Sequence, residues 1–247
     1  MENTSQKVVA FATLVALPFA LGAFLLAWAP AAQYDLTDPR GDGYVQPRSI
    51  QTVVERTQNS TVTLSCELPN NKGSFGSAWA ADLPNKYQIG YPTTLVTNHH
   101  VIDDCLDGKG KLIVYTIKGD EYPALINSWD AENDLATVAT RADLKPLKFS
   151  QYEPWPGYWV AAVGTADGYE GSVAFGNVLN GTIDEIFTTV PLSHGNSGGP
   201  LIDNEGNVVG INSWGSTTEQ YNGAKSLNAM CKVIMKCDGE LYWERDN

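Results

Sequence analysis

The feature that most limits the fold of this chain is a succession of short segments rich in β-branched, aromatic and other apolar residues, separated by Gly, Asn, Asp and Pro. Segments of about four to eight such residues between turn-forming residues are typical of β-strands. Many short strands with no long helices between them predict an all-β domain, either a sandwich or a barrel. The expected strands cover residues 61–66, 77–83, 93–97, 112–117, 122–129, 135–140, 158–163, 172–179, 182–189, 201–203 and 208–214.

A Pro-rich joint at residues 153–157 divides these segments into two sets, which suggests two lobes. Residues 50–57 predict a short helix that leads into the domain. Residues 226–236 have apolar side chains at spacings of three and four, which predicts a short C-terminal helix. We expect the folded domain to cover residues 50–247, after a polar linker with Pro and Gly at residues 33–49.

The N-terminal part of the chain carries a membrane signal, because residues 8–32 contain no charged side chain. At about 1.5 Å per residue, about 20 such residues would cross a hydrocarbon core of about 30 Å. The run exceeds the about 7–15 apolar residues of a cleaved signal peptide, which favours an uncleaved anchor within residues 1–32, although Ala29 and Ala31 leave cleavage open. Lys7 favours a cytoplasmic N-terminus. We expect a membrane-anchored protein with an extracytoplasmic domain, or a secreted protein if the segment is removed.

The charge balance argues against nucleic acid as a partner. The chain has 28 acidic and 16 basic residues, a formal net charge of -12 and a sequence pI near 4.6. Such a surface repels phosphate backbones, and no cluster of lysine and arginine opposes this. The acidic surplus is better explained as keeping an exported domain soluble.

The even number of cysteines in an exported chain favours disulfide bonds. Cys231 and Cys237 lie close together in the sequence, which suggests that they pair and that Cys66 pairs with Cys105. The other two pairings and free buried thiols stay open. No Cys-x-x-Cys spacing supports metal ligation by Cys105 and the nearby histidines, so we expect no metal.

Residues 192–201 read LSHGNSGGPL, a composition that predicts a tight turn with an exposed backbone. Such a turn can present the Ser197 hydroxyl to solvent. It can also direct the N–H groups of Gly195 and Ser197 at one point, where an oxyanion would be stabilised. The alternative is a glycine-rich hairpin turn without any chemistry.

Two further segments carry the other groups that acyl transfer needs. Residues 95–102, LVTNHHVI, place His100 where an apolar strand ends, and residues 133–139, NDLATVA, place Asp134 where another begins. A carboxylate entering a buried strand is costly unless a donor such as an imidazole N–H satisfies it. Ser197 as nucleophile, His100 as base and Asp134 as its orienting acid follow the known order His, Asp, Ser.

The motifs TNHHVI, NDLA and GNSGGPL resemble those of trypsin-fold serine proteases, most closely the HtrA/Deg branch and its exported relatives in Gram-positive bacteria. The similarity covers about residues 50–237. It implies two six-stranded antiparallel β-barrels with a cleft between them, and hydrolysis of peptide bonds in polypeptide substrates through an acyl-enzyme, without a cofactor. HtrA enzymes usually append a PDZ domain, which we do not expect here.

The resemblance selects His100, Asp134 and Ser197 as the catalytic residues. His99 takes a position that the family usually fills with a neutral polar residue, and we expect it to face solvent or to cap the strand end. Lower-ranked alternatives for the acid are Asp103, Asp104 and Asp130.

The resemblance also implies where a substrate would bind. Ser213, Trp214 and Gly215 resemble the segment that pairs with the substrate backbone and walls the specificity pocket. Pro191 stands six residues before Ser197, where trypsin has an acidic residue, so we expect a small or medium apolar side chain before the scissile bond and not Lys or Arg. His194 departs from the proline common in HtrA enzymes and is expected at the pocket or its rim.

Two other functions are compatible with the same residues. A catalytically silent module of this fold would bind or sense exported polypeptides. An esterase is disfavoured, because the usual esterase fold places its serine between a strand and a helix. The oligomeric state stays open.

Overall fold

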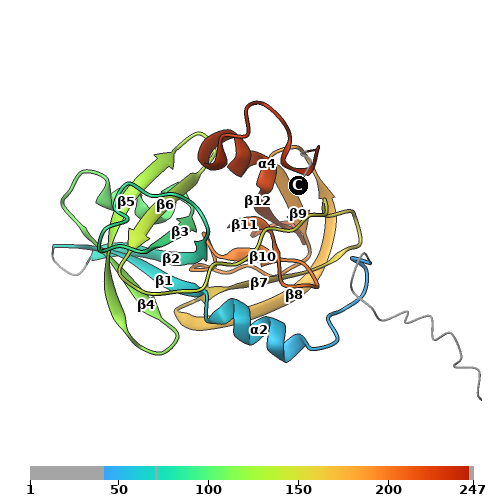
Figure 1. Ribbon diagram of the computed structural model, residues 1–247. Helices are drawn as coiled ribbons and strands as arrows, with labels where there is room; N and C mark the ends of the chain where they lie inside the picture. Colours follow the sequence, from blue (N-terminus) through green and yellow to red (C-terminus); the bar gives the residue numbers. More distant parts are fainter. Residues whose placement is uncertain (1–41, 70–71, 245–247) are drawn as a thin grey trace, which may run out of the picture. The chain divides into compact units, whose positions relative to one another are not determined.

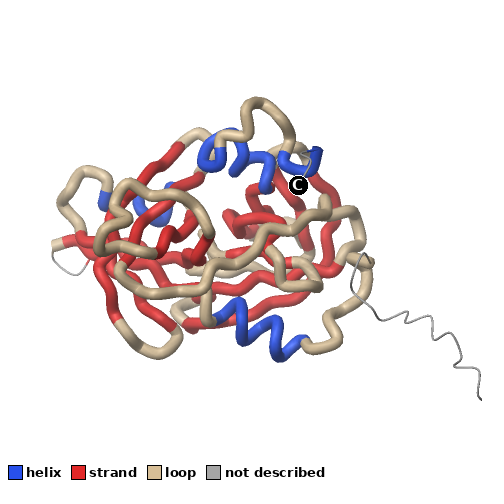
Figure 2. The backbone as a smooth tube through the Cα atoms, viewed as in Figure 1, coloured by secondary structure: helices blue, strands red, loops and turns tan. Residues whose placement is uncertain are grey.

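The computed structural model describes residues 42–69 and 72–244. Strands dominate this part of the chain, and the helices are short (Figure 2). The expected all-β architecture with two six-stranded antiparallel barrels is confirmed. The expected N-terminal membrane helix lies outside the described residues. Within the described ranges, no helix is both long and apolar enough to span a membrane.

Barrel 1 is formed by the first six strands, all paired antiparallel, in the closed order β1-β2-β3-β6-β5-β4 (Figure 1). The β3 and β6 strands agree with the predicted ranges, and the other four differ by a few residues at one or both ends. The strands are β1 (Thr61–Leu68), β2 (Lys72–Ala81), β3 (Thr93–Thr97), β4 (Lys111–Thr116), β5 (Glu121–Asp130) and β6 (Leu135–Thr140).

Barrel 2 closes in the order β10-β11-β12-β9-β8-β7. Its strand β12 was not predicted, because the sequence NGAKS lacks the β-branched and aromatic residues that mark a strand. Pairing with β9 and β11 imposes the extended conformation instead. The strands are β7 (Trp159–Ala166), β8 (Tyr169–Gly181), β9 (Glu185–Thr188), β10 (Pro200–Ile202), β11 (Val208–Gly215) and β12 (Asn222–Ser226).

The helices are short and follow or precede the strands. The predicted C-terminal helix begins at α4 (Leu227–Met230), where the Ser226 hydroxyl accepts a hydrogen bond from the Ala229 N–H (3.2 Å), and it continues as a π-helical turn. The helical elements are α2 (Ile50–Gln58), α3 (His99–Ile102), η1 (Asp103–Cys105), α4, η2 (Cys231–Met235) and η3 (Tyr242–Glu244).

The two barrels share a hydrophobic core. One cluster of buried side chains contains Trp79 and Leu135 from barrel 1 together with Trp159 and Ile211 from barrel 2. Two further clusters each draw their strand residues from one barrel. Neighbouring residues of one strand serve different clusters, as Trp159 and Val160 do on β7, so this strand is apolar along most of its length without alternation.

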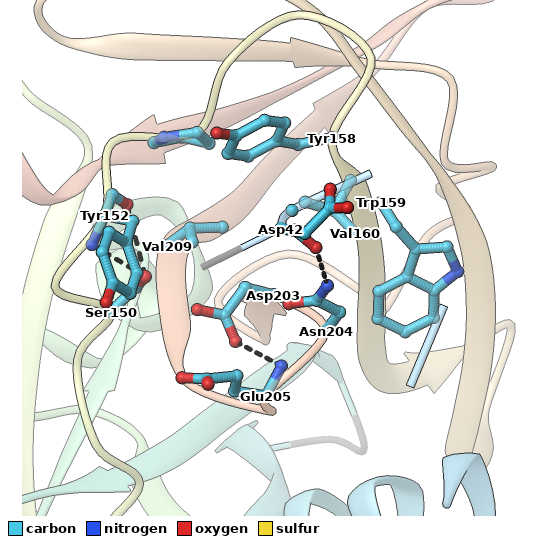
Figure 3. Close-up of a pocket in the computed structure, with 12 residues that line it drawn as sticks. Asp42, Ser150, Tyr152, Tyr158, Trp159, Val160, Asp203, Asn204, Glu205 and Val209 are labelled. Atoms are coloured by element: carbon cyan, nitrogen blue, oxygen red, sulfur yellow. Dashed lines mark hydrogen bonds between the residues drawn. The ribbon is translucent and has the colours of Figure 1, made fainter. Parts of the chain in front are cut away.

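The end of the predicted linker is attached to barrel 2. The Asn204 side-chain amide donates to the carbonyls of Asp42 and Val45, both at 2.7 Å, and the Trp159 N–H donates to the Gly43 carbonyl at 2.7 Å. Figure 3 shows Asn204 below Asp42, with Tyr158 above them. The chain is therefore held on barrel 2 before helix α2 begins.

A partly buried carboxyl group lies beside this attachment. Asp203 Oδ1 accepts hydrogen bonds from the backbone N–H groups of Glu205 (2.9 Å) and Asn207 (2.8 Å), and Figure 3 shows the carboxylate near Asn204. Burial raises the pKa of Asp203 above its ordinary value, although these hydrogen bonds oppose the shift.

Candidate functional site

The glycine-rich turn lies between β9 and β10, and its glycines are required sterically. Gly195 has a φ of +92°, and a Cβ there would lie 2.1 Å from the Thr165 carbonyl oxygen. Gly198 has a φ of +85°, and a Cβ there would lie 2.1 Å from the Ser77 carbonyl oxygen. The turn is therefore pressed against strands of both barrels, which only glycine allows at these positions.

Two N–H groups of this turn have no acceptor. In the part of the chain that the structure describes, neither the Gly195 N–H nor the Ser197 N–H donates a hydrogen bond. The N–H of the intervening Asn196 donates to the Ser193 carbonyl at 3.1 Å. The Gly195 and Ser197 amides are thus free to bind an oxygen atom from outside the chain.

His100 is oriented by Asp134. It lies in α3, directly after β3, and its ring Nδ1 is 2.9 Å from both carboxylate oxygens of Asp134. The backbone N–H of His100 donates to Asp134 Oδ1 at 3.0 Å. Because Nδ1 faces a carboxylate, it carries the proton in the neutral ring, and Nε2 has a lone pair.

Asp134 is held in place from three directions. It precedes β6 with a φ of +54°, a left-handed conformation that aspartate tolerates better than most residues. The Asn98 side-chain amide donates to the Asp134 carbonyl oxygen at 2.8 Å, and the Ser213 hydroxyl donates to Oδ2 at 2.8 Å. Burial alone would raise the pKa of Asp134, but hydrogen bonds from His100 and Ser213 lower it below its ordinary value. The carboxylate is therefore ionised at neutral pH.

Ser197 belongs to the same cluster. Its hydroxyl donates to the Ser213 carbonyl oxygen at 3.0 Å, and no hydrogen bond joins Ser197 to His100 among the described residues. The turn nevertheless lies beside α3, since a Cβ at Gly198 would be 3.1 Å from the Asn98 nitrogen. The structure thus brings Ser197, His100 and Asp134 together, with Ser213 in contact with both Ser197 and Asp134.

The alternatives to these residues have other partners. The His99 ring lies 3.7 Å from Asp103, four residues later in the chain. Asp130 accepts hydrogen bonds from the backbone and side chain of Asn133, which lower its pKa, and Asp104 is exposed. The carboxylate that contacts the His100 ring is that of Asp134.

The residues expected to bind substrate lie on two neighbouring segments. Trp214 packs against Phe187 and Tyr221, with ring centroids 6.2 and 6.0 Å away. A Cβ at Gly215 would lie 3.0 Å from the Leu192 carbonyl oxygen, which places this strand end beside the turn. The other two expected residues, Pro191 and His194, are exposed.

Asn222 connects the same two segments and was not predicted. Its side-chain NH₂ donates to the Val190 carbonyl at 2.7 Å, and its Oδ1 accepts from the Ser216 N–H at 3.1 Å. The sequence gives little signal for this role, because Asn222 begins the strand β12 that lacks a strand-like composition.

Ser77 and Asn98 are the other site residues that the sequence interpretation missed. Both side chains are fully buried. Buried polar side chains are nearly always hydrogen-bonded, so a serine next to the apolar residues of β2 and an asparagine directly after β3 were the available signal.

Disulfide bonds pair Cys66 with Cys105 and Cys231 with Cys237, as proximity in the sequence suggested. Cys105 ends η1, which follows α3, so the segment that carries His100 is covalently attached to β1. Among the described residues, no group of three or more His, Cys, Asp or Glu side chains could hold a metal ion.

Comparison with known families identifies this arrangement. The model of the trypsin-like peptidase domain matches residues 76–211, more than half of the chain. The chain belongs to the trypsin-like peptidase family. The match includes Ser77, His100, Asp134 and Ser197 of this trypsin-like peptidase and ends before Ser213.

Individual relatives of this trypsin-like peptidase are proteases. The probable periplasmic serine endoprotease DegP-like of Chlamydia trachomatis is 33% identical over 129 residues, which are 48% of this chain and 25% of the relative. Rat serine protease HTRA3 is 28% identical over 200 residues, which are 74% of this chain and 42% of the relative. The chain thus spans less than half the length of these curated relatives.

A solved structure supports the same family. The serine endoprotease from Yersinia pestis superimposes on this trypsin-like peptidase with a TM-score of 0.66 and 25% sequence identity. The match covers 77% of this chain and 66% of that one. The likeness therefore includes most of the two-barrel fold.

Proposed function

We propose that this trypsin-like peptidase is a serine endopeptidase in which Ser197 is the nucleophile, His100 the general base and Asp134 the acid that orients it. The observation that carries this proposal is the pair of 2.9 Å contacts between His100 Nδ1 and the Asp134 carboxylate. They leave the Nε2 lone pair available to the hydroxyl of a nearby serine.

Acylation begins when Ser197 Oγ attacks the carbonyl carbon of the scissile peptide bond. The Oγ–C bond forms, the Ser197 proton moves to His100 Nε2, and the carbonyl electron pair moves to its oxygen. The proton on Nε2 then passes to the amine nitrogen as the C–N bond breaks. Water repeats these steps on the acyl-enzyme, which releases the acid product and restores Ser197.

The free N–H groups of Gly195 and Ser197 are suited to the oxyanion. An oxygen atom between them would accept two hydrogen bonds that no group of the described chain takes. Loss of one such donor typically lowers kcat by about 10²–10³. Both donors belong to a turn whose shape glycine permits.

The hydrogen bond from Ser197 Oγ to the Ser213 carbonyl favours a second candidate function. In this conformation the hydroxyl is directed at a backbone acceptor and not at His100. A catalytically silent module that binds exported polypeptides would have no need for a Ser197–His100 hydrogen bond. For the endopeptidase, rotation of the Ser197 side chain about its Cα–Cβ bond accompanies substrate binding.

The expected substrates are polypeptides with a small or medium apolar residue before the scissile bond. Pro191 offers no negative charge to a Lys or Arg side chain, whereas Trp214 offers an apolar wall. Cleavage of a peptide library should favour apolar residues at this position. Preferential cleavage after Lys or Arg would contradict this specificity.

We also propose that the protein acts outside the cytoplasm. Both disulfide bonds, the formal net charge of -12 and the name of the periplasmic Chlamydia relative support export. The uncharged residues 8–32 would keep the domain at the membrane. Sequencing the N-terminus of the mature protein tests the anchor, because a start near Gln33 would show that the segment is removed.

The experiment that tests the activity is labelling with a fluorophosphonate probe, which reacts with activated serine hydroxyls. We expect the wild-type protein to be labelled and Ser197→Ala to remain unlabelled. Ser193→Ala is the matched control, because Ser193 is exposed in the same turn and, within residues 42–69 and 72–244, only its carbonyl takes part in a hydrogen bond. No labelling of the folded wild-type protein would support the silent module.

A further inference from the structure

We propose that Ser77 is a positioning residue that fixes the orientation of the turn carrying Ser197. This inference rests on the proposed function of that turn. Ser77 lies on β2 of barrel 1, whereas the turn belongs to barrel 2, and Ser77 has no exposed surface. A hydroxyl in such a place contributes only if its hydrogen bonds are satisfied.

Ser77 holds two carbonyl groups of the turn. Its hydroxyl donates to the Gly195 carbonyl oxygen at 2.6 Å, and its backbone N–H donates to the Ser197 carbonyl oxygen at 2.7 Å. The hydroxyl also accepts from the Thr165 N–H at 3.0 Å. One residue of barrel 1 therefore contacts both residues that supply the free N–H groups.

These contacts fix peptide planes next to the free donors. In a trans peptide, the carbonyl of one residue points opposite to the N–H of the next. The Asp167 N–H holds the His194 carbonyl at 2.6 Å and so orients the plane that carries the Gly195 N–H. Ser77 holds the following plane through the Gly195 carbonyl. The two planes meet at the Cα of Gly195.

This arrangement compensates for the freedom of glycine. Gly195 is required because any Cβ would collide with the Thr165 carbonyl, but glycine rotates more freely about its backbone bonds than any other residue. The Asn196 N–H also holds the second plane, through the Ser193 carbonyl at 3.1 Å, so loss of the Ser77 hydroxyl loosens this plane at the Gly195 carbonyl and lets the neighbouring donors shift from the oxyanion position. The Ser77 hydroxyl therefore keeps the donor preorganised, which is the condition for electrostatic stabilisation of a transition state.

The position of Ser77 is itself fixed by neighbouring hydroxyl groups. The Thr97 hydroxyl donates to the Ser77 carbonyl at 2.8 Å. The Thr165 hydroxyl lies 2.6 Å from the Thr63 hydroxyl of barrel 1. Together they form a buried polar network across the two barrels, which we call the inter-barrel hydroxyl network (Thr63, Ser77, Thr97 and Thr165).

The test is Ser77→Ala, which leaves the Gly195 carbonyl and the Thr165 N–H without their partner. We expect kcat to fall about tenfold or more with KM little changed. The reason is that a correctly placed Gly195 N–H stabilises the transition state more than the bound substrate, and the variant misplaces this donor. Rates are divided by the concentration of folded protein. Ser77→Cys is the second variant if Ser77→Ala does not fold, since a thiol is close in size but a weak donor.

Ser226→Ala is the matched control. The Ser226 hydroxyl is buried, donates to the Ile183 carbonyl at 2.5 Å and accepts from the Ala229 N–H, the same pattern as Ser77. Ser226→Ala should lower the melting temperature by about as much as Ser77→Ala does, and it should leave kcat unchanged. If Ser77→Ala changed kcat no more than Ser226→Ala does, the proposal would be wrong.

A second readout separates this inference from the proposed function. The amide resonances of Gly195 and Ser197 in an NMR spectrum should shift or broaden in the Ser77 variants and not in Ser226→Ala. If the wild-type protein neither cleaves peptides nor reacts with the probe, the proposed function fails, and the NMR comparison still decides the role of Ser77. Unchanged Gly195 and Ser197 resonances would overturn that role.

Discussion

The Ser213 hydroxyl donates a 2.8 Å hydrogen bond to Oδ2 of Asp134, the carboxylate that also contacts the His100 ring. Its own carbonyl oxygen accepts the Ser197 hydroxyl at 3.0 Å. Ser213 was expected from its resemblance to a substrate-binding segment. In the structure it also contacts the proposed acid from barrel 1 and the proposed nucleophile from barrel 2.

Substitution Ser213→Ala removes one of the hydrogen bonds that lower the pKa of Asp134. We expect this pKa to rise, so that the carboxylate becomes protonated at a higher pH, and kcat/KM at neutral pH to fall about tenfold, since hydrogen bonds to charged groups contribute about 1.5–3 kcal/mol. Peptide hydrolysis measured from pH 4 to 8 checks both effects. Ser128→Ala, which removes a hydroxyl bonded to Thr137 in barrel 1, should leave the profile unchanged.

Asp203 predicts a pH dependence of stability. Because burial raises its pKa in the folded state, that state binds the proton more tightly than the unfolded chain does, whose aspartates titrate near about 3.9. The contribution of Asp203 to the free energy of unfolding is therefore largest at low pH and declines as pH rises through the raised folded-state pKa. Asp203→Asn should remove this decline.

Urea unfolding of Asp203→Asn at pH 4 and pH 7 measures the effect. The exposed Asp82 provides the control, and Asp82→Asn should keep the wild-type difference between the two pH values. An equal difference in wild type and Asp203→Asn would mean that the carboxyl group of Asp203 does not contribute.

The two disulfide bonds should contribute unequally to stability. Cys66 and Cys105 are 39 positions apart, whereas Cys231 and Cys237 are 6 apart. On the loop-entropy estimate, the longer loop stabilises by about 4 kcal/mol and the shorter by about 2 kcal/mol. Replacing each pair by alanine and measuring urea midpoints tests the order.

The longer disulfide should also affect activity. Its removal frees the segment that follows α3 and should lower kcat, whereas loss of the C-terminal disulfide should not. If the two double variants lose equal stability and equal activity, neither the loop-length argument nor the link to His100 holds.

Local sequence patterns predicted the parts of this molecule whose conformation depends on neighbouring residues in the chain. The apolar segments at residues 93–97 and 135–140 define β3 and β6 without error, since polar or turn-forming residues bound them. The glycines around Ser197 indicated a special turn, because positions with positive φ are usually occupied by glycine and can therefore be seen in the sequence.

The roles of Ser77, Asn98 and Asn222 depend on distant partners. Ser77 reaches Thr165 and Gly195, which are 88 and 118 positions away, and Asn98 reaches Asp134 across 36. The periodicity of apolar residues gives no information on contacts between such distant residues. From a single sequence, these residues can be seen only as polar groups in or beside apolar strands. The same applies to β12, whose conformation comes from its neighbours.

The inter-barrel hydroxyl network has a consequence for any attempt to divide the protein. A cut in the joint at residues 153–157 would give one fragment with His100, Asp134 and Ser77 and another with Ser197 and Ser213. The two Ser77 donors that hold the Gly195 and Ser197 carbonyls would then lie on a different fragment from the turn itself. On the proposed function, peptide hydrolysis would be seen only when the two fragments recombine. The hydrolysis rate would then be proportional to the concentration of reassembled protein.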